Sequence, residues 1–465
     1  MHGITLRTAP SDWEILQQEN GYASALLAGE FRVHPAAIAV GVEKVTPVYR
    51  VVREDDNAAV IPWTPMAARV NPDFTGDFEQ TIRIPAGGLY RIETSLETKS
   101  TQPGITWLYR GDVVLHLGVG NVFIIAGQSN SAGHAWDYAM DPPRLDVHLY
   151  RNRSRWDLAS HPMNESTGAP SLPNEEMGIP GVSPYLSFAR NFADFSHCPV
   201  GLVQTALGGS PMSRWVPGEG DLYGNMVEKI HETHGRYAGV LWYQGCSDGD
   251  GENAPKYLAR FTAMVQALRE ELGYEIPFFT FQLNRCVDCH EDDAWGQVRQ
   301  AQLDAARTLP GVHILPTTNC ALSDGIHNSA HAQMMLGEKL ARQAAHWLLP
   351  GFPAFEAPEL CSAVMQEDGR LCLTFDHMAL GFVGFGGDEH RRGFTLEDAE
   401  GVIALTGFRA NREDRNHIYL TPERRPGPGA VLSFAWEEDP TRLPPVDEVT
   451  YLPPLSFYRR PLDAD

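Results

Sequence analysis

The chain has 465 residues, of which 43% are hydrophobic and 10% aromatic, and it carries a formal net charge of -22. This length exceeds the usual size of one hydrophobic core, so it predicts two or three domains. A chain this negative repels polyanions, which argues against nucleic acid and membrane surfaces as partners and favours a neutral substrate.

The amino terminus, MHGITLRTAPSDWE, lacks the basic segment and apolar core of an export signal. No later stretch is apolar enough to cross a bilayer. From these residues we expect a cytoplasmic protein without a membrane anchor.

Short β-type runs separated by Pro and Gly extend from Glu43 to about Gly118. Apolar residues alternate with polar ones in the run from Thr81 to Ile84, which puts them on one face of a strand. This pattern predicts a small antiparallel sandwich in residues 1–118. Trp63 or Trp107 could bind sugar there, although a module that serves only for packing is the commoner case.

The stretch FIIAGQSNSAGH predicts a buried strand that delivers a serine at a sharp turn. The apolar run Val122–Ala126 is short, β-branched and without polar alternation, as in a strand covered on both faces. Gly127 permits a tight turn, so the hydroxyl of Ser129 can stand just past the strand's carboxyl end. Ser129 is therefore the candidate nucleophile, and a polar loop of ordinary turn residues is the alternative.

After Ser129 the pattern changes to strand followed by helix. Four further strands are expected, at residues 200–204, 239–243, 277–281 and 312–315. Together with the Ser129 strand they make five βα units, which predicts a doubly wound parallel sheet with helices on both faces. The stretch from Trp136 to Gly181 is expected to form loops along the rim of the site. Beyond Pro353 the strands return and predict a third, β-rich domain.

Seven cysteines, an odd number in a long chain, do not form the pattern of a disulfide framework. We expect most of them to be reduced and buried. The run Cys286–His290 resembles the C-x-x-C-H haem attachment pattern, but no second feature supports a haem. A redox pair or two loop cysteines are the remaining interpretations, and no cofactor is expected.

A serine nucleophile needs a base, and usually a carboxylate that orients the base. Asp324 and His327 offer both within one turn after the last predicted strand. His331, and Asp288 with His290, are competing pairs, and each histidine could simply lie on the surface.

Oxyanion donors are expected at two other strand ends. Leu207–Ser210 contains two glycines after the second strand, and Gln244 with Gly245 follows the third. Each segment could be an ordinary turn, but all of these features fall at one edge of one sheet. Their joint placement predicts a serine hydrolase.

Five blocks in this order, GQSN, ALGGSPMSRW, GVLWYQGCSD, VRQAQ and DGIH, resemble the SGNH-type carbohydrate esterases, specifically the sialate O-acetylesterase-like group. The resemblance runs from about Gly120 to Leu349. It implies a three-layer α/β/α fold with a flavodoxin-like five-stranded sheet, removal of acetyl groups from sugar hydroxyls, and no metal. The expected domains are 1–118, 119–352 and 353–465.

By this resemblance Ser129 is the nucleophile, and His327 with Asp324 forms the base pair. The backbone N–H groups of Ser129 and Gly208 and the side-chain amide of Gln244 are the implied oxyanion donors, with Gly209 or Asn130 as the next choices. The residues expected to contact substrate are Gln128, Asn130, Arg214 and Trp242.

The sequence departs from the family pattern at two positions. Ser131 stands where relatives commonly have methionine, and Cys246 stands where they have glutamate. The expected function is deacetylation of sialate-type sugars through an acetyl-enzyme. An acetylxylan or hemicellulose acetylesterase of the same fold is the first alternative, and a degenerate, glycan-binding protein is the second.

Overall fold

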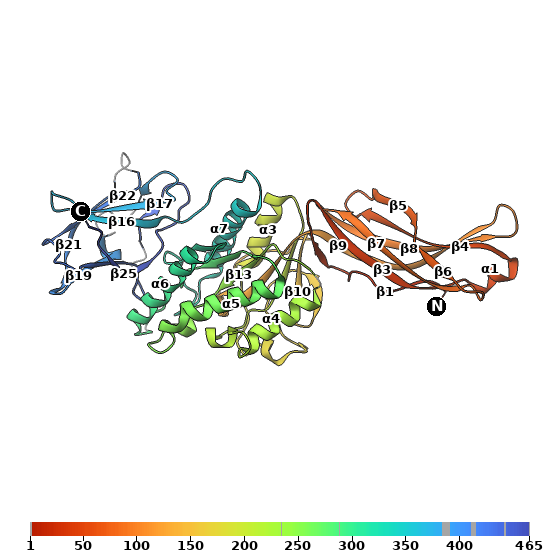
Figure 1. Cartoon of the computed structure of the whole chain (residues 1–465), viewed down its shortest axis with the longest axis horizontal. Helices are drawn as coiled ribbons and strands as arrows, with labels where there is room; N and C mark the ends of the chain where they lie inside the picture. Colours follow the sequence, from red (N-terminus) through yellow and green to blue (C-terminus); the bar gives the residue numbers. More distant parts are fainter. Residues whose placement is uncertain are drawn as a thin grey trace.

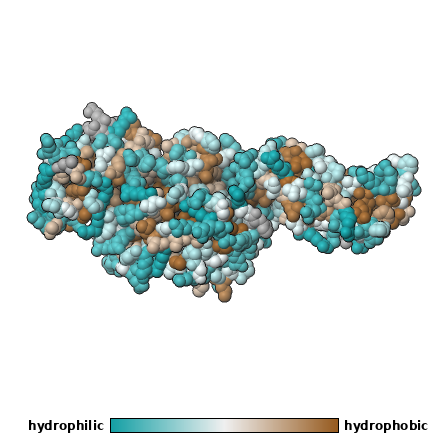
Figure 2. All heavy atoms as spheres, in the orientation of Figure 1, coloured by the Kyte–Doolittle hydropathy of each residue, from teal (hydrophilic) through white to brown (hydrophobic). Residues whose placement is uncertain are grey.

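The structure is a computed structural model that describes residues 2–233, 235–287, 289–383, 391–410, 415–440 and 443–464. Asp288, part of one competing pair, lies outside these residues. The molecule is elongated, with a β-rich part at each end and helices around a sheet in the middle (Figure 1). Hydrophilic side chains cover much of the face drawn in Figure 2, and hydrophobic ones show between them. The prediction of a mixed α/β fold is confirmed.

The amino-terminal part consists largely of antiparallel strands that share one apolar core. One sheet has the order β1-β3-β7-β6, and β4, β5, β8 and the first half of β9 pair beside it. Alternate residues of β3 and β7 point into the core, including Ile82 and Ile84. The bounds are β1 Gly3–Thr8, β2 Ile15–Gln17, β3 Tyr22–Arg32, α1 Pro35–Val40, β4 Val42–Arg53, β5 Ala59–Pro65, β6 Ala68–Val70, β7 Thr75–Pro85, β8 Gly88–Ser100 and β9 Thr106–Gly127.

The central sheet contains the five strands expected from the sequence. They lie in the order β12-β9-β13-β14-β15, and each neighbouring pair is parallel. Numbered along the chain this order is 2-1-3-4-5, that of flavodoxin-like sheets. The bounds are β12 Val200–Gln204, β13 Gly239–Tyr243, β14 Phe278–Phe281 and β15 Val312–Leu315.

Two further strands extend this sheet from the segment expected to contain only loops. β10 (Val147–Arg151) pairs parallel to β12, and β11 (Arg155–Leu158) pairs antiparallel to β10. The sequence hid β10 because His148 and Arg151 interrupt its apolar run. Both are buried, and each donates to a backbone carbonyl, His148 to Leu145 O and Arg151 to Leu158 O.

The two faces of the central sheet pack against different helices. Phe123 and Ile125 of β9 belong to the apolar cluster that includes residues of α3 (Tyr185–Ser196) and α7 (Ala330–Leu348). Val122, Ile124 and Ala126 belong to the cluster that includes residues of α4 (Asp221–Glu232) and α5 (Tyr257–Leu272). The sequence spaces five apolar residues of α5 at i, i+4, i+7, i+8 and i+11, which predicts one apolar helix face, and all five are buried: Tyr257, Phe261, Met264, Val265 and Leu268.

The remaining helices are short or lie near the C-terminal sheets. α2 spans Ser129–Ala132, α6 spans Asp292–Thr308, and 3-10 turns lie at Leu172–Asn174, Met212–Trp215, Cys246–Asp248 and Ala254–Lys256. No helix within the described ranges is both long and apolar enough to span a membrane.

The C-terminal part contains two four-stranded antiparallel sheets, β16-β17-β22-β21 and β20-β19-β23-β25, and the pair β18-β24. It packs against α6, and the side-chain amide of Gln282 donates to Ser456 O. The bounds are β16 Glu359–Met365, β17 Leu371–Asp376, β18 Phe382–Val383, β19 Phe394–Asp398, β20 Gly401–Ile403, β21 Leu405–Ala410, β22 His417–Pro422, β23 Val431–Phe434, β24 Val446–Asp447 and β25 Phe457–Pro461.

The expected division into residues 1–118, 119–352 and 353–465 stays a proposal. β9 crosses its first boundary as one strand of 22 residues. The first half of β9 pairs with β8, and its last residues pair with β12 and β13.

Gly127, at the end of β9, provides a test of how the nucleophile turn is built. Its φ is 118°, and a Cβ there would lie 2.3 Å from Tyr243 O. Gly127→Ala should lower the free energy of unfolding by more than about 2 kcal/mol, since such backbone strain alone costs about 1–3 kcal/mol. Gly224→Ala, in α4 with nothing within 4 Å of the added Cβ, should instead stabilise by roughly 0.5–1 kcal/mol. Equal denaturation midpoints for the two variants would contradict this account of the turn.

Candidate active site

Ser129 is the first residue of α2, directly beyond the carboxyl end of β9. The N–H of Gln128 donates to Tyr243 O at 2.9 Å, which fixes the turn against the neighbouring strand β13. Ser129 as a whole is 6% exposed. Its place at the carboxyl edge of the sheet agrees with the turn expected from the sequence.

Asp324 and His327 lie in the loop between β15 and α7. His327 Nδ1 is 2.7 Å from Asp324 Oδ2, and Asp324 Oδ1 accepts the N–H groups of Ile326 and His327. Burial tends to raise the pKa of Asp324, but these hydrogen bonds outweigh it and lower the pKa below its usual value. An ionised carboxylate at Nδ1 leaves Nε2 as the nitrogen that can accept a proton.

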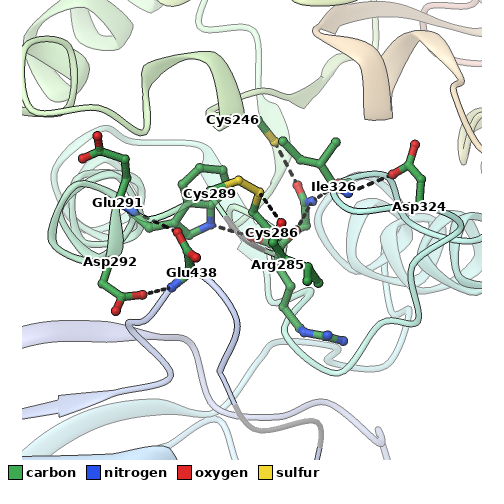
Figure 3. Close-up of a disulfide and its surroundings, with 12 residues drawn as sticks. Cys246, Arg285, Cys286, Cys289, Glu291, Asp292, Asp324, Ile326 and Glu438 are labelled. Carbon is green, nitrogen blue, oxygen red and sulfur yellow. Dashed lines mark hydrogen bonds between the residues drawn. A yellow bond between two sulfur atoms is a disulfide. The ribbon is translucent and has the colours of Figure 1, made fainter.

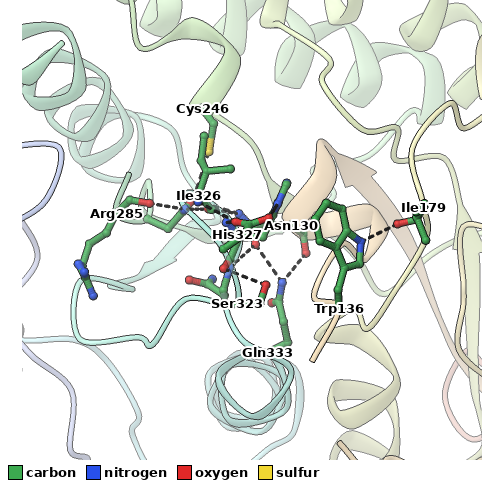
Figure 4. Close-up of polar contacts among 12 residues, drawn as sticks. Asn130, Trp136, Ile179, Cys246, Arg285, Ser323, Ile326, His327 and Gln333 are labelled. Carbon is green, nitrogen blue, oxygen red and sulfur yellow. Dashed lines mark hydrogen bonds and ion pairs between the residues drawn. The ribbon is translucent and has the colours of Figure 1, made fainter. Parts of the chain in front are cut away.

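Asn130 connects the serine turn to the histidine loop (Figure 4). Its Oδ1 accepts the N–H of Asn328 at 3.0 Å, and its Nδ2 lies 3.4 Å from Ile326 O. Ile326 and Asn328 flank His327, and Asn130 follows Ser129. The turn that carries the predicted nucleophile and the loop that carries the predicted base are therefore hydrogen-bonded to each other, although they are far apart in the sequence.

His134 and Glu176 form a second pair that the sequence analysis missed. His134 Nε2 lies 3.2 Å from Glu176 Oε2, with both side chains buried, and the His134 ring is 5.3 Å from the His327 ring. The only signal in the sequence was the histidine five positions after Ser129. Glu176 comes from the long segment expected to form the rim, and nothing in its sequence marks it.

Glu176 also accepts the hydrogen bond of the Gly208 N–H, the backbone group predicted to stabilise the oxyanion. The N–H of Gly208 donates to Glu176 Oε2 at 3.0 Å, and Gly178 N–H donates to Oε1. Burial tends to raise the pKa of Glu176, but the His134 contact and these two bonds bring it down to about 2. The carboxylate is therefore ionised at neutral pH and takes the Gly208 N–H that the resemblance assigned to a substrate oxygen.

The geometry contradicts the oxyanion role predicted for Gln244. Its Nε2 donates to Ser210 O at 3.1 Å and to Asp248 Oδ2 at 2.6 Å, so both amide hydrogens are used. Gln244 holds the loop after β13 to the loop after β12. The sequence placed Gln244 at the correct strand end, but the direction of its side chain depends on Asp248.

Three of the four expected substrate contacts are used in other ways. Gln128 is buried and accepts the N–H groups of Gly245 and Ser247, and Arg214 pairs with Asp221. Trp242 is buried on the face of β13 that packs against α5, with its ring against Trp215 and Phe261. Asn130, the fourth, is 1% exposed and makes the connections described above.

The competing histidines lie on the surface. His331 is exposed in the first turn of α7, and His290 is exposed. Asp288, the proposed partner of His290, lies outside the described residues. Among the residues that the structure covers, no group of three or more His, Cys, Asp or Glu side chains could hold a metal ion.

Two cysteines form a disulfide beside the histidine loop (Figure 3). Cys286 is bonded to Cys289, and the N–H of Val287 between them donates to Gly325 O at 2.8 Å. A pair was one of the two interpretations left open for this motif. The expectation that most cysteines are reduced and buried holds only in its first half: five of the seven lie outside the disulfide, but of those five only Cys320 is fully buried.

Cys246, at the position of the family's glutamate, is a neutral hydrogen-bond donor. Its Sγ lies 3.3 Å from Asn284 Oδ1, and burial raises the pKa of the thiol to about 12. Asn284 in turn donates to Ile326 O beside His327. Cys246 therefore contributes to the hydrogen bonds behind the histidine loop without contributing a charge.

The central part of the chain matches a family model described as carbohydrate esterase, sialic acid-specific acetylesterase, over residues 119–346. A carbohydrate acetylesterase from Xanthomonas citri has a similar structure, with a TM-score of 0.64 and 19% identity over 98% of this chain and 99% of that chain. A protein from Arabidopsis thaliana has a TM-score of 0.42 and 25% identity over 49% of this chain and 98% of its own. NanS has a TM-score of 0.40 and 14% identity, over 49% and 97%. No curated protein sequence matches significantly.

Gln244→Ala should lower stability and turnover together. The substitution leaves Asp248 Oδ2 and Ser210 O without this donor in a buried loop, and an unsatisfied buried group costs about 1–3 kcal/mol. Thermal midpoint, kcat and KM measured on one preparation check this. A kcat lowered by tenfold or more at an unchanged midpoint would restore the oxyanion role.

Glu176→Gln should make the thermal midpoint less sensitive to a fall in pH below about 5. Because the pKa of Glu176 falls from 4.5 to about 2 on folding, its contribution is complete above about pH 4.5 and is lost as the pH falls toward about 2. The glutamine variant lacks this contribution, so its thermal midpoint should drop less than that of wild type between about pH 5 and about pH 3. Glu175→Gln, at the exposed neighbouring residue, is the matched control and should follow wild type. Identical profiles for Glu176→Gln and wild type would contradict the assignment.

Proposed function

Because the chain belongs, through residues 119–346, to the carbohydrate esterase family of sialic acid-specific acetylesterases, we propose that it removes O-acetyl groups from sugars through an acetyl-enzyme formed on Ser129. The observation that carries this proposal is the connection through Asn130 between the Ser129 turn and the two neighbours of His327. The strand order and the two apolar clusters support a three-layer SGNH arrangement of the central domain.

In the first step His327 Nε2 takes the proton of the Ser129 hydroxyl as the oxygen attacks the acetyl carbonyl. Asp324, held ionised by two backbone N–H groups, keeps the ring oriented and stabilises its protonated form. The imidazolium then returns the proton to the departing sugar oxygen, which leaves the acetyl group on Ser129.

In the second step the same histidine takes a proton from water as the water oxygen attacks the acetyl carbon. The bond from that carbon to Ser129 then breaks, the histidine returns the proton to the serine oxygen, and acetate leaves. The N–H of Ser129, at the first position of α2, is the proposed oxyanion donor, since the first N–H groups of a helix lack intrahelical partners. With Gln244 and Gly208 engaged elsewhere, Gly209 is the proposed second donor. Gly209 is exposed, and a Cβ added there would meet nothing within 4 Å apart from its chain neighbours, so there is open space beside this residue.

The glycan-binding alternative is less well supported than turnover, because the His327–Asp324 pair is intact although Cys246 replaces the glutamate. Sialate and hemicellulose remain the two candidate substrate classes. Acetate release from acetylated sialic acids, xylans and mannans, measured side by side, decides between them. Binding of an acetylated glycan without release of acetate would instead identify the degenerate protein.

Ser129→Ala should lower acetate release by at least about a thousandfold, and His327→Ala should do the same, since both exchange the transferred proton. Acetate release by Asp324→Asn should fall less far, because Asp324 acts on the reaction only through the histidine. Ser131→Ala is the control, since this buried hydroxyl in the same helix donates to Ala126 O and should retain most turnover. Comparable rates for Ser129→Ala and wild type would refute the mechanism.

A further inference from the structure

Trp136 is the exposed aromatic side chain that lies against the proposed base. It is 54% exposed, and its ring lies 5.8 Å from the ring of His327 and 6.5 Å from that of His134. Of the two tryptophans that follow Ser129 most closely in the central part, Trp156 is buried, whereas Trp136 is open to solvent. Its position beside His327 is visible in Figure 4.

The Trp136 indole is held in place from behind. Its Nε1 donates to Ile179 O at 2.8 Å, and the preceding residue, Ala135, forms a β-bridge with Val182. Gly181 lies so close to this segment that a Cβ there would be 2.2 Å from Ala135 O and 3.2 Å from Trp136 Cδ1. The ring is therefore anchored by backbone contacts although more than half of the residue is in water.

A fixed, exposed aromatic face is suited to the C–H face of a sugar ring. Stacking there removes apolar surface from water on both partners and needs little ordering of a ring that is already fixed. Ile179 and Met177 add exposed apolar side chains on the same segment. The buried residues expected from the sequence to contact substrate offer no comparable surface.

We propose that Trp136 is the platform on which the sugar ring of the acetylated substrate stacks, so that the ester carried by that ring reaches Ser129 and His327. This inference rests on the proposed esterase function and adds to it the residue that selects esters of sugars over other acetate esters.

The test compares a sugar ester with an ester that has no ring. Wild type, Trp136→Ala and Trp136→Phe are assayed for acetate release from ethyl acetate and from a sugar ester. The sugar ester is the one that wild type hydrolyses best among a monoacetylated methyl xyloside, an acetylated methyl mannoside and an O-acetylated sialic acid. Trp136→Ala should raise KM for the sugar ester about tenfold at a nearly unchanged kcat, while kcat/KM for ethyl acetate stays within about twofold. Trp136→Phe keeps an aromatic face and should restore most of the sugar affinity.

Trp347→Ala is the matched control. Trp347 is 53% exposed, stacks on His313 and donates its indole N–H to Glu356, but it lies near the far end of α7. At about 1.5 Å per residue it is roughly 25 Å along the helix from the histidine loop. Its loss should leave the preference for the sugar ester unchanged.

An equal loss on both esters in Trp136→Ala, or an unchanged KM for the sugar ester, would overturn the platform. If the alanine variant does not fold, Trp136→Leu, which keeps an apolar side chain but no aromatic face, takes its place, and the same two outcomes decide the matter. Failure of wild type to release acetate from ethyl acetate and from all three sugar esters would instead refute the proposed function itself, so the two failures are distinguishable.

Discussion

The side-chain amide of Asn130 is the interaction on which the arrangement of the site depends. Asn130 is buried, and its side chain joins the turn that carries Ser129 to the backbone on both sides of His327. The hydrogen bond from Asn328 N–H to Asn130 Oδ1 spans 198 residues of sequence. Gln333 of α7 donates to the same Oδ1, and Asn284 accepts from the same Nδ2. Three loops that each leave a different strand are thus held together by one amide, which has both the donors and the acceptor that this requires.

Hydrogen-bonded amides, rather than apolar contacts, also hold the other side of the site. Glu176 accepts from Asn164, whose Oδ1 accepts from Gln204 and Asn152, and Asn152 accepts from Lys229. Burial lowers the pKa of Lys229 to about 7. This chain of contacts therefore runs from an ionised carboxylate to an amine that loses its proton more easily than an exposed lysine does. A network of this kind fixes positions only while every member is paired.

The sequence predicted the features that depend on local pattern. The strand into Ser129, the apolar face of α5 and the Asp324–His327 pair followed from apolar spacing and from residues at strand ends. β10 was missed because its buried His148 and Arg151 find partners that the sequence does not reveal. Gln244 and Trp242 were placed at the correct strand end, but their roles depend on where their side chains point. Asp248 determines this for Gln244, and the apolar cluster beneath α4 and α5 determines it for Trp242.

The continuity of β9 has a mechanical meaning. Its 22 residues rise about 3.3 Å each, so one hydrogen-bonded strand of roughly 70 Å runs from the amino-terminal sheets to the turn before Ser129. Paired with β8 along its first half and with β12 and β13 at its end, it has no linker at which the two parts could swing. The amino-terminal sheets are therefore held at a fixed distance and orientation from the nucleophile turn, and a force applied to them is transmitted to that turn through a single strand.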